Sequence, residues 1–98
     1  MFVNIIHSYR YVVAICDKEL IGQKFETEKF QLDVKENFYK GNEMTKSEAI
    51  EIMKKMSLED ATFNIVGKKS VQAAIEAKII NPEGVLEIAG IPYAMVLL

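Results

Sequence analysis

The chain has 98 residues, 50% of them apolar and 27% charged, and its formal net charge at pH 7 is −2. These values predict one globular domain over residues 1–98, and they exclude a nucleic-acid binding mode that depends on an overall basic surface. One cysteine and one histidine are too few for an internal disulfide or a structural zinc site, so we expect no metal and no other cofactor.

A β-hairpin is predicted for the first sixteen residues, where two β-branched and aromatic runs flank a short polar break. If Ser8 and Tyr9 form its tip, the numbers of paired residues add up to seventeen. Cys16 then lies beside Met1, and His7 lies near the tip. Both faces of this hairpin are apolar, so we expect a sheet that is covered on both sides, by helices or by a partner chain.

The next part of the chain predicts a loop, a strand and a connector. Charged residues around Gly22 indicate a loop over residues 17–27. Alternating apolar and polar residues over 29–34 are typical of a half-buried strand, and turn-forming residues follow over 35–44.

Two helices are predicted in the second half, one on either side of a strand. Thr45 and Glu48 have the spacing of a capping box, in which each side chain binds a backbone amide left free at a helix start. The first helix therefore begins at Thr45 and ends near Ser57. A β-branched and aromatic run predicts a buried strand over 61–66, and apolar residues at helical spacing predict the second helix over 68–79.

The last fourteen residues, 85–98, form two apolar runs around Gly90 and Pro92, which predicts a second hairpin. The sum is five or six strands and two helices, with hairpins at both ends. This order favours an α+β domain with a mainly antiparallel sheet.

The segment from Asn64 to the second helix is the strongest candidate for a binding site. A strand that delivers Gly67, Lys68 and Lys69 to a helix start would expose free amides, a positive dipole end and two cations, all suited to phosphate or an RNA backbone. It is no phosphate-binding Walker loop, because Thr62 stands where that motif needs glycine.

Cys16, Asp17 and His7 are the other polar candidates. The predicted hairpin separates the thiol from the imidazole by about 20 Å at ~3.3 Å per residue, which excludes a Cys–His pair within one chain. We interpret Cys16 as a small buried residue at a strand end and Asp17 as a cap for the segment directly after it. His7 is either a plain surface residue or a proton carrier or RNA-stacking group.

Four segments together resemble a known family: "ICDKELIGQKF" (15–25), "FYKG" (38–41), "NIVGKKSV" (64–71) and "IAGIPYA" (88–94). The chain is similar to small archaeal proteins that are known only as a domain of unknown function. The resemblance implies an archaeal, cytoplasmic protein associated with translation.

Within these segments, the residues that match the family pattern are Asp17, Gly22, Asn64 and Gly67. The chain departs from the pattern at Tyr93, where the family has a histidine after the proline. That departure argues against an acid–base role at this position.

Our leading hypothesis is a non-enzymatic accessory or binding module for RNA, a ribosomal protein or another ribonucleoprotein partner, acting through Gly67, Lys68 and Lys69 with Asn64 nearby. One alternative is a small ligand-binding protein or enzyme that uses Cys16 and Asp17, with His7 supplied across a homodimer. The other is a homo-oligomeric scaffold, suggested by the two-sided apolar hairpins. No leader sequence or apolar run long enough to cross a bilayer is visible, so we expect a cytoplasmic protein without a membrane partner.

Overall fold

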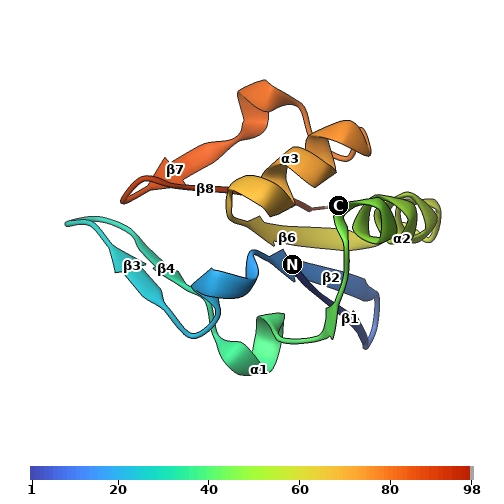
Figure 1. Cartoon of the computed structure of the whole chain (residues 1–98), viewed down its shortest axis with the longest axis horizontal. Helices are drawn as coiled ribbons and strands as arrows, with labels where there is room; N and C mark the ends of the chain where they lie inside the picture. The colour runs from blue at the N-terminus through green and yellow to red at the C-terminus, as the bar shows by residue number, and fades with distance from the viewer. Residues whose placement is uncertain (98) are drawn as a thin grey trace.

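The computed structural model describes residues 1–97 and has the predicted α+β architecture (Figure 1). A six-stranded, mainly antiparallel sheet has the order β5-β1-β2-β6-β8-β7, and a separate two-stranded sheet pairs β3 with β4. The strands are β1 (Phe2–His7), β2 (Tyr11–Cys16), β3 (Lys24–Glu26), β4 (Gln31–Asp33), β5 (Asn42–Glu43), β6 (Thr62–Val66), β7 (Leu86–Ile88) and β8 (Ile91–Val96). The α-helices are α1 (Glu36–Tyr39), α2 (Lys46–Leu58) and α3 (Lys68–Glu76), and the 3-10 turns are η1 (Lys18–Leu20) and η2 (Pro82–Gly84).

The first hairpin forms, but its predicted register is wrong by one residue. Phe2 pairs with Cys16 and His7 pairs with Tyr11, so the numbers of paired residues add up to eighteen. The loop has three residues, and the Ser8 amide donates a hydrogen bond to the carbonyl of Arg10 at 3.3 Å. A pattern that is apolar on both faces does not distinguish neighbouring registers, so the turn geometry decides between them.

The pairing of β2 with β6 is parallel, and the sequence did not predict it. Cys16 lies beside Val66 at the carboxyl ends of the two strands. The chain therefore leaves both strands at the same edge of the sheet, and the next residues along the chain, Asp17 and Gly67, become neighbours.

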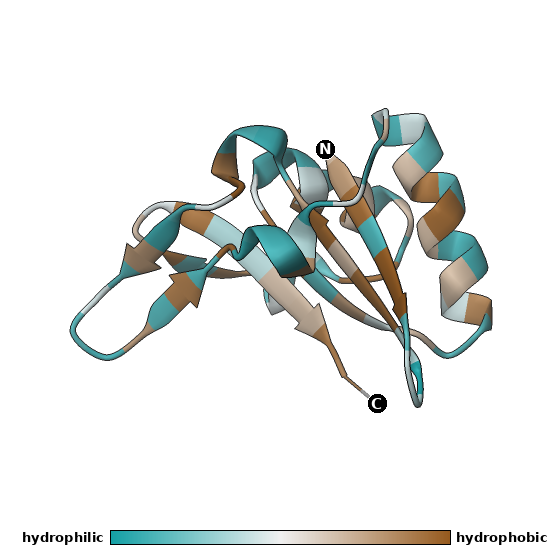
Figure 2. Ribbon diagram, turned by 90° about the horizontal axis from the view of Figure 1, so that it is seen from below, coloured by the Kyte–Doolittle hydropathy of each residue, from teal (hydrophilic) through white to brown (hydrophobic). Residues whose placement is uncertain are grey.

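Both faces of the sheet are covered, as expected. On one face, α2 and α3 enclose a core that includes Val13, Phe63 and Met53. On the other face, η1, α1 and the β3–β4 hairpin enclose a second core that includes Ala14 and Val34. Figure 2 shows apolar residues concentrated in the central strands, whereas α2 alternates between apolar and polar residues.

The predicted element boundaries hold best where the local signal is strongest. The capping box at the start of α2 is present: the Thr45 amide donates to Glu48 Oε1 at 2.9 Å, and the Glu48 amide donates to Thr45 Oγ1 at 3.2 Å. The second helix begins at Lys68 as predicted but ends at Glu76, because the backbone turns left-handed at Lys78 (φ 61°).

Four elements replace predicted loops, and one hairpin is confirmed. The turn η1 and strand β3 lie within the predicted loop over 17–27, and α1 and β5 lie within the predicted connector over 35–44. Strands β7 and β8 form the second hairpin; its predicted last residue, Leu98, lies outside the described residues. No helix within residues 1–97 is long and apolar enough to cross a membrane.

Candidate functional site

The carboxylate of Asp17 sits at the start of α3, inside the protein. Its Oδ1 accepts hydrogen bonds from the Ser70 amide at 2.8 Å and the Ser70 hydroxyl at 2.7 Å, and its Oδ2 accepts one from the Lys69 amide at 3.1 Å. Asp17 and Ser70 are 3% and 0% exposed. A negative charge at this place also complements the positive end of the helix dipole.

Gly67 makes room for this carboxylate. Its φ is +106°, and a Cβ added there would lie 2.3 Å from Asp17 Cγ. The Gly67 amide donates to the carbonyl of Pro92 at 2.8 Å, while the Asp17 amide donates to the carbonyl of Val66 at 3.1 Å. These contacts join β2, β6, α3 and β8 at one place, which we call the Asp17 joint (Asp17, Gly67, Ser70 and Pro92).

The Asp17 joint corrects two predictions. The amides of Lys69 and Ser70 were expected to be free for an anion, but they already bind a carboxylate of the same chain. Asp17 was expected to cap the segment directly after it, but its side chain makes no capping bond to η1 and caps α3 instead. The amides of Lys69 and Ser70 are therefore not available to an anion near α3.

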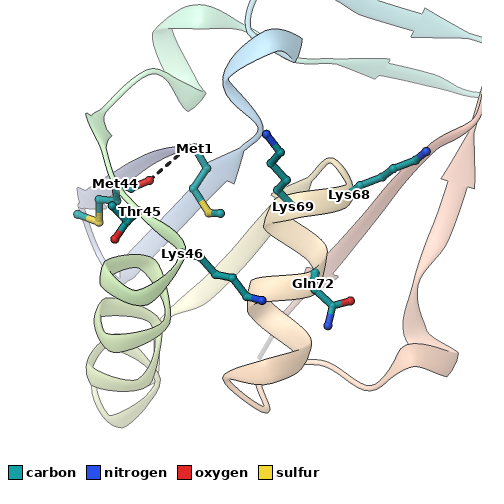
Figure 3. Close-up of a pocket in the computed structure, with 7 residues that line it drawn as sticks. All are labelled: Met1, Met44, Thr45, Lys46, Lys68, Lys69 and Gln72. Carbon is teal, nitrogen blue, oxygen red and sulfur yellow. Dashed lines mark hydrogen bonds between the residues drawn. The ribbon is translucent and has the colours of Figure 1, made fainter.

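The two lysines at the start of α3 remain exposed at one end of a groove between α2 and α3 (Figure 3). The groove has a volume of about 520 Å³ and is lined by Met1, Met44, Thr45, Lys46, Lys68, Lys69 and Gln72. We call it the α2–α3 groove. Three of its seven lining residues are lysines and none is acidic. Because Lys46 is paired with Glu76, the positive charge of the groove comes from Lys68 and Lys69.

The three lysines differ in their neighbours and directions. Lys46 extends from α2 across the groove and is paired with Glu76, whereas Lys68 and Lys69 form no ion pair within residues 1–97. In Figure 3, Lys68 and Lys69 diverge from the start of α3. A smaller hollow of about 270 Å³ on the other side of this helix start includes Glu19 and is less favourable for an anion.

Asn64 does not belong to this site. It lies in the middle of β6, paired with Ala14 on one side and Met95 on the other, and its side chain lines a separate cavity on the opposite face of the sheet. The four predicted anion-binding residues are therefore divided: the structure brings Gly67, Lys68 and Lys69 together and leaves Asn64 apart.

Cys16 and His7 are also apart. Cys16 is fully buried, and burial, followed by the charge of Asp17, raises the pKa of its thiol to about 11. His7 lies at the other end of the hairpin, where its ring stacks on that of Tyr11 with the ring centroids 4.1 Å apart. The thiol is therefore protonated at neutral pH and has no imidazole beside it within the described chain.

Sequence reasoning missed Ser70, the buried partner of Asp17. Its position three residues after Gly67 is the position from which a helix start usually binds its cap, and that spacing was the available signal. The cap itself comes from a residue 53 positions away, so no local pattern identifies it.

The chain is a small α+β domain. Three of the four segments on which the family resemblance rests, residues 15–25, 64–71 and 88–94, meet at the Asp17 joint. The chain belongs to the family described as "Protein of unknown function (DUF424)", whose model matches residues 6–98. The resemblance to an uncharacterised archaeal family is thereby confirmed.

One solved structure shows the same fold. It is the crystal structure of an uncharacterized conserved protein from Methanopyrus kandleri, with a TM-score of 0.88 and 22% sequence identity, and the similarity covers 97% of this chain and 88% of that chain. No curated protein matches the chain.

Proposed function

We propose that this protein is a non-enzymatic cytoplasmic binding module for RNA, free or within a ribonucleoprotein, and that the α2–α3 groove is its contact surface. The observation that carries the proposal is the lining of this groove, which contains no acid and three lysines, two of which, Lys68 and Lys69, form no ion pair within residues 1–97, although the whole chain has a net charge of −2. A local positive surface on an acidic protein directs an anionic partner to one place.

The arrangement of the cations favours an extended polyanion over a single phosphate. The helix-start amides of Lys69 and Ser70, which would hold one compact anion, are already bound to Asp17. Lys68 and Lys69 diverge and have flexible side chains, so they suit successive phosphates along a backbone. Met1 and Met44 add an apolar part to the groove lining, on the side of α2, on which a base can rest.

The test is the binding of fluorescently labelled single-stranded and hairpin RNA while the salt concentration rises from about 50 to about 200 mM. Binding is expected to weaken with salt, because phosphate contacts release counterions. The double variant Lys68→Ala with Lys69→Ala is expected to bind more weakly and to lower the slope of log affinity against log salt by about 1 to 2.

The matched control is Lys54→Ala with Lys55→Ala, which removes the same charge from exposed positions in the second half of α2. It is expected to retain most of the affinity. Salt-independent binding, no binding to either RNA, or an equal loss in both double variants contradicts the proposal.

A further inference from the structure

A second cavity, on the face of the sheet opposite the α2–α3 groove, has the lining of a small-molecule site. It has a volume of about 210 Å³ and lies between β6 and β8 on one side and β4 and α1 on the other. Its polar lining consists of Tyr39, Asn64, Tyr93 and Gln31, and the remaining five lining residues are apolar. We call it the Asn64 cavity.

Tyr39 is the most informative of these residues. It is 7% exposed, yet its hydroxyl has no hydrogen-bond partner within residues 1–97, whereas every fully enclosed side-chain N or O atom in that range has one. The hydroxyl is therefore not fully enclosed by the protein, and Tyr39 is one of the residues that line the cavity. Burial, followed by the nearby Cys16, raises the pKa of Tyr39 to about 12, which keeps the hydroxyl neutral and able to donate.

Asn64 and Tyr93 add further unpaired groups on the same face. Val66 pairs with Tyr93 and Asn64 pairs with Met95, so the side chains of Asn64 and Tyr93 project from neighbouring strands two residues apart in register. Neither side chain has a hydrogen-bond partner within the described chain. Polar groups in a largely apolar pocket without partners are typical of a surface that a ligand completes.

The lining also restricts the ligand. None of the nine lining residues is charged, so an ion is not favoured. The volume corresponds to about seven waters at ~30 Å³ each, which suits a ring system smaller than a typical drug. Two tyrosine rings favour a flat partner, and amide and hydroxyl groups offer both donors and acceptors.

We propose that the Asn64 cavity binds a neutral heteroaromatic ring that carries both hydrogen-bond donors and acceptors, of the kind found in nucleobases. The site is separate from the α2–α3 groove and does not depend on RNA binding there. Two kinds of ligand could supply such a ring: a free heterocycle and an unpaired base of a nucleic acid.

The experiment is a two-dimensional NMR titration with free adenine, free uracil and cyclohexanol, following the side-chain amide of Asn64. Adenine or uracil is expected to shift this amide saturably, and cyclohexanol is not. Repeating the titration with short oligoriboadenylate and oligouridylate distinguishes the sources: tighter binding than the free base indicates a base within a strand, and weaker binding indicates a free heterocycle.

Two variants with matched controls locate the binding. Tyr39→Phe removes only an unpaired hydroxyl, so it is expected to fold normally and to weaken binding about fivefold. Its control is Tyr9→Phe at the hairpin tip, where Tyr9 is fully exposed. Because Asn64→Leu removes the side-chain amide itself, binding to this variant is followed by the backbone amides of Ile65 and Ala94 in the same lining. Asn64→Leu is expected to abolish their saturable shift, whereas Asn42→Leu in β5 is not.

Three results would overturn this assignment. They are the absence of a saturable shift with either base, an equal response to cyclohexanol, and unchanged affinity in Tyr39→Phe. Lys68→Ala with Lys69→Ala is expected to leave the response to free bases unchanged. The proposal for the Asn64 cavity and the proposal for the RNA surface can therefore be refuted separately.

Discussion

Two structural constraints exclude a side chain at Gly67. Its backbone is in the positive-φ region, and the Asp17 carboxylate occupies the position of its missing Cβ. The sequence placed Gly67 between a strand and a helix start, and the structure adds its positive φ and the close approach of Asp17. The identity of a single residue thus follows from a contact between distant segments.

Replacing Gly67 tests both constraints. Gly67→Ala is expected to lower the free energy of unfolding in urea by at least about 2 kcal/mol, because the variant is strained and displaces Asp17. Gly84→Ala is the control, since Gly84 has no positive φ and open space around its Cβ position. The control is expected to change stability by less than about 0.5 kcal/mol. Similar losses in both variants would refute this account.

Cys16 predicts a particular pH dependence. Its pKa is raised from the ordinary 9.0 to about 11 in the folded protein, so the unfolded chain loses the thiol proton first as the pH rises. The contribution of the buried thiol to the free energy of unfolding is therefore complete below pH 9.0 and is lost between pH 9.0 and about 11. Urea unfolding across this range is expected to show a steeper fall for the wild type than for Cys16→Ala. Parallel curves would contradict the burial effect.

At the scale of elements, the Asp17 joint connects parts that share no local signal. It attaches the end of β2 to the start of α3, and the adjoining bond from Gly67 to Pro92 attaches β8. The element boundaries that the sequence predicted correctly are those marked by a pattern of neighbouring residues, such as the capping box of α2. Strand β3 and the parallel pairing of β2 with β6 depend on partners outside their own segments, so local patterns gave no sign of them.

The strength of this joint is measurable by substituting Asp17. Asp17→Ala leaves two amides and the Ser70 hydroxyl without their acceptor, so unfolding in urea is expected to require about 2 to 4 kcal/mol less. Asp17→Asn keeps one acceptor and is expected to lose less. Glu19→Ala removes an exposed acid two residues away and serves as the control. Equal effects of Asp17→Ala and Glu19→Ala would show that the joint does not stabilise the fold.

At the scale of the whole molecule, the sequence predicted the fold class and the two-sided covering of the sheet, because apolar periodicity reports directly on burial. It did not predict how the candidate site is arranged. Lys68 and Lys69 were identified by their position at a helix start. The sequence did not show that the Asp17 carboxylate binds the amides at this start. Asn64 was grouped with them by sequence proximity, although alternation along β6 sends its side chain to the other face.

The parallel pairing of β2 with β6 also affects how the chain folds. Val12 pairs with Thr62, so residues fifty positions apart in the sequence must meet before the first contact between these strands forms. Closing such a loop costs entropy that local hairpins do not lose, and proteins with many distant contacts fold slowly. The hairpin of β1 and β2 is able to form early, whereas the Asp17 joint has to wait until the crossover is complete. Contacts made this late mainly slow unfolding, so we expect substitution of Asp17 to speed unfolding more than it slows folding.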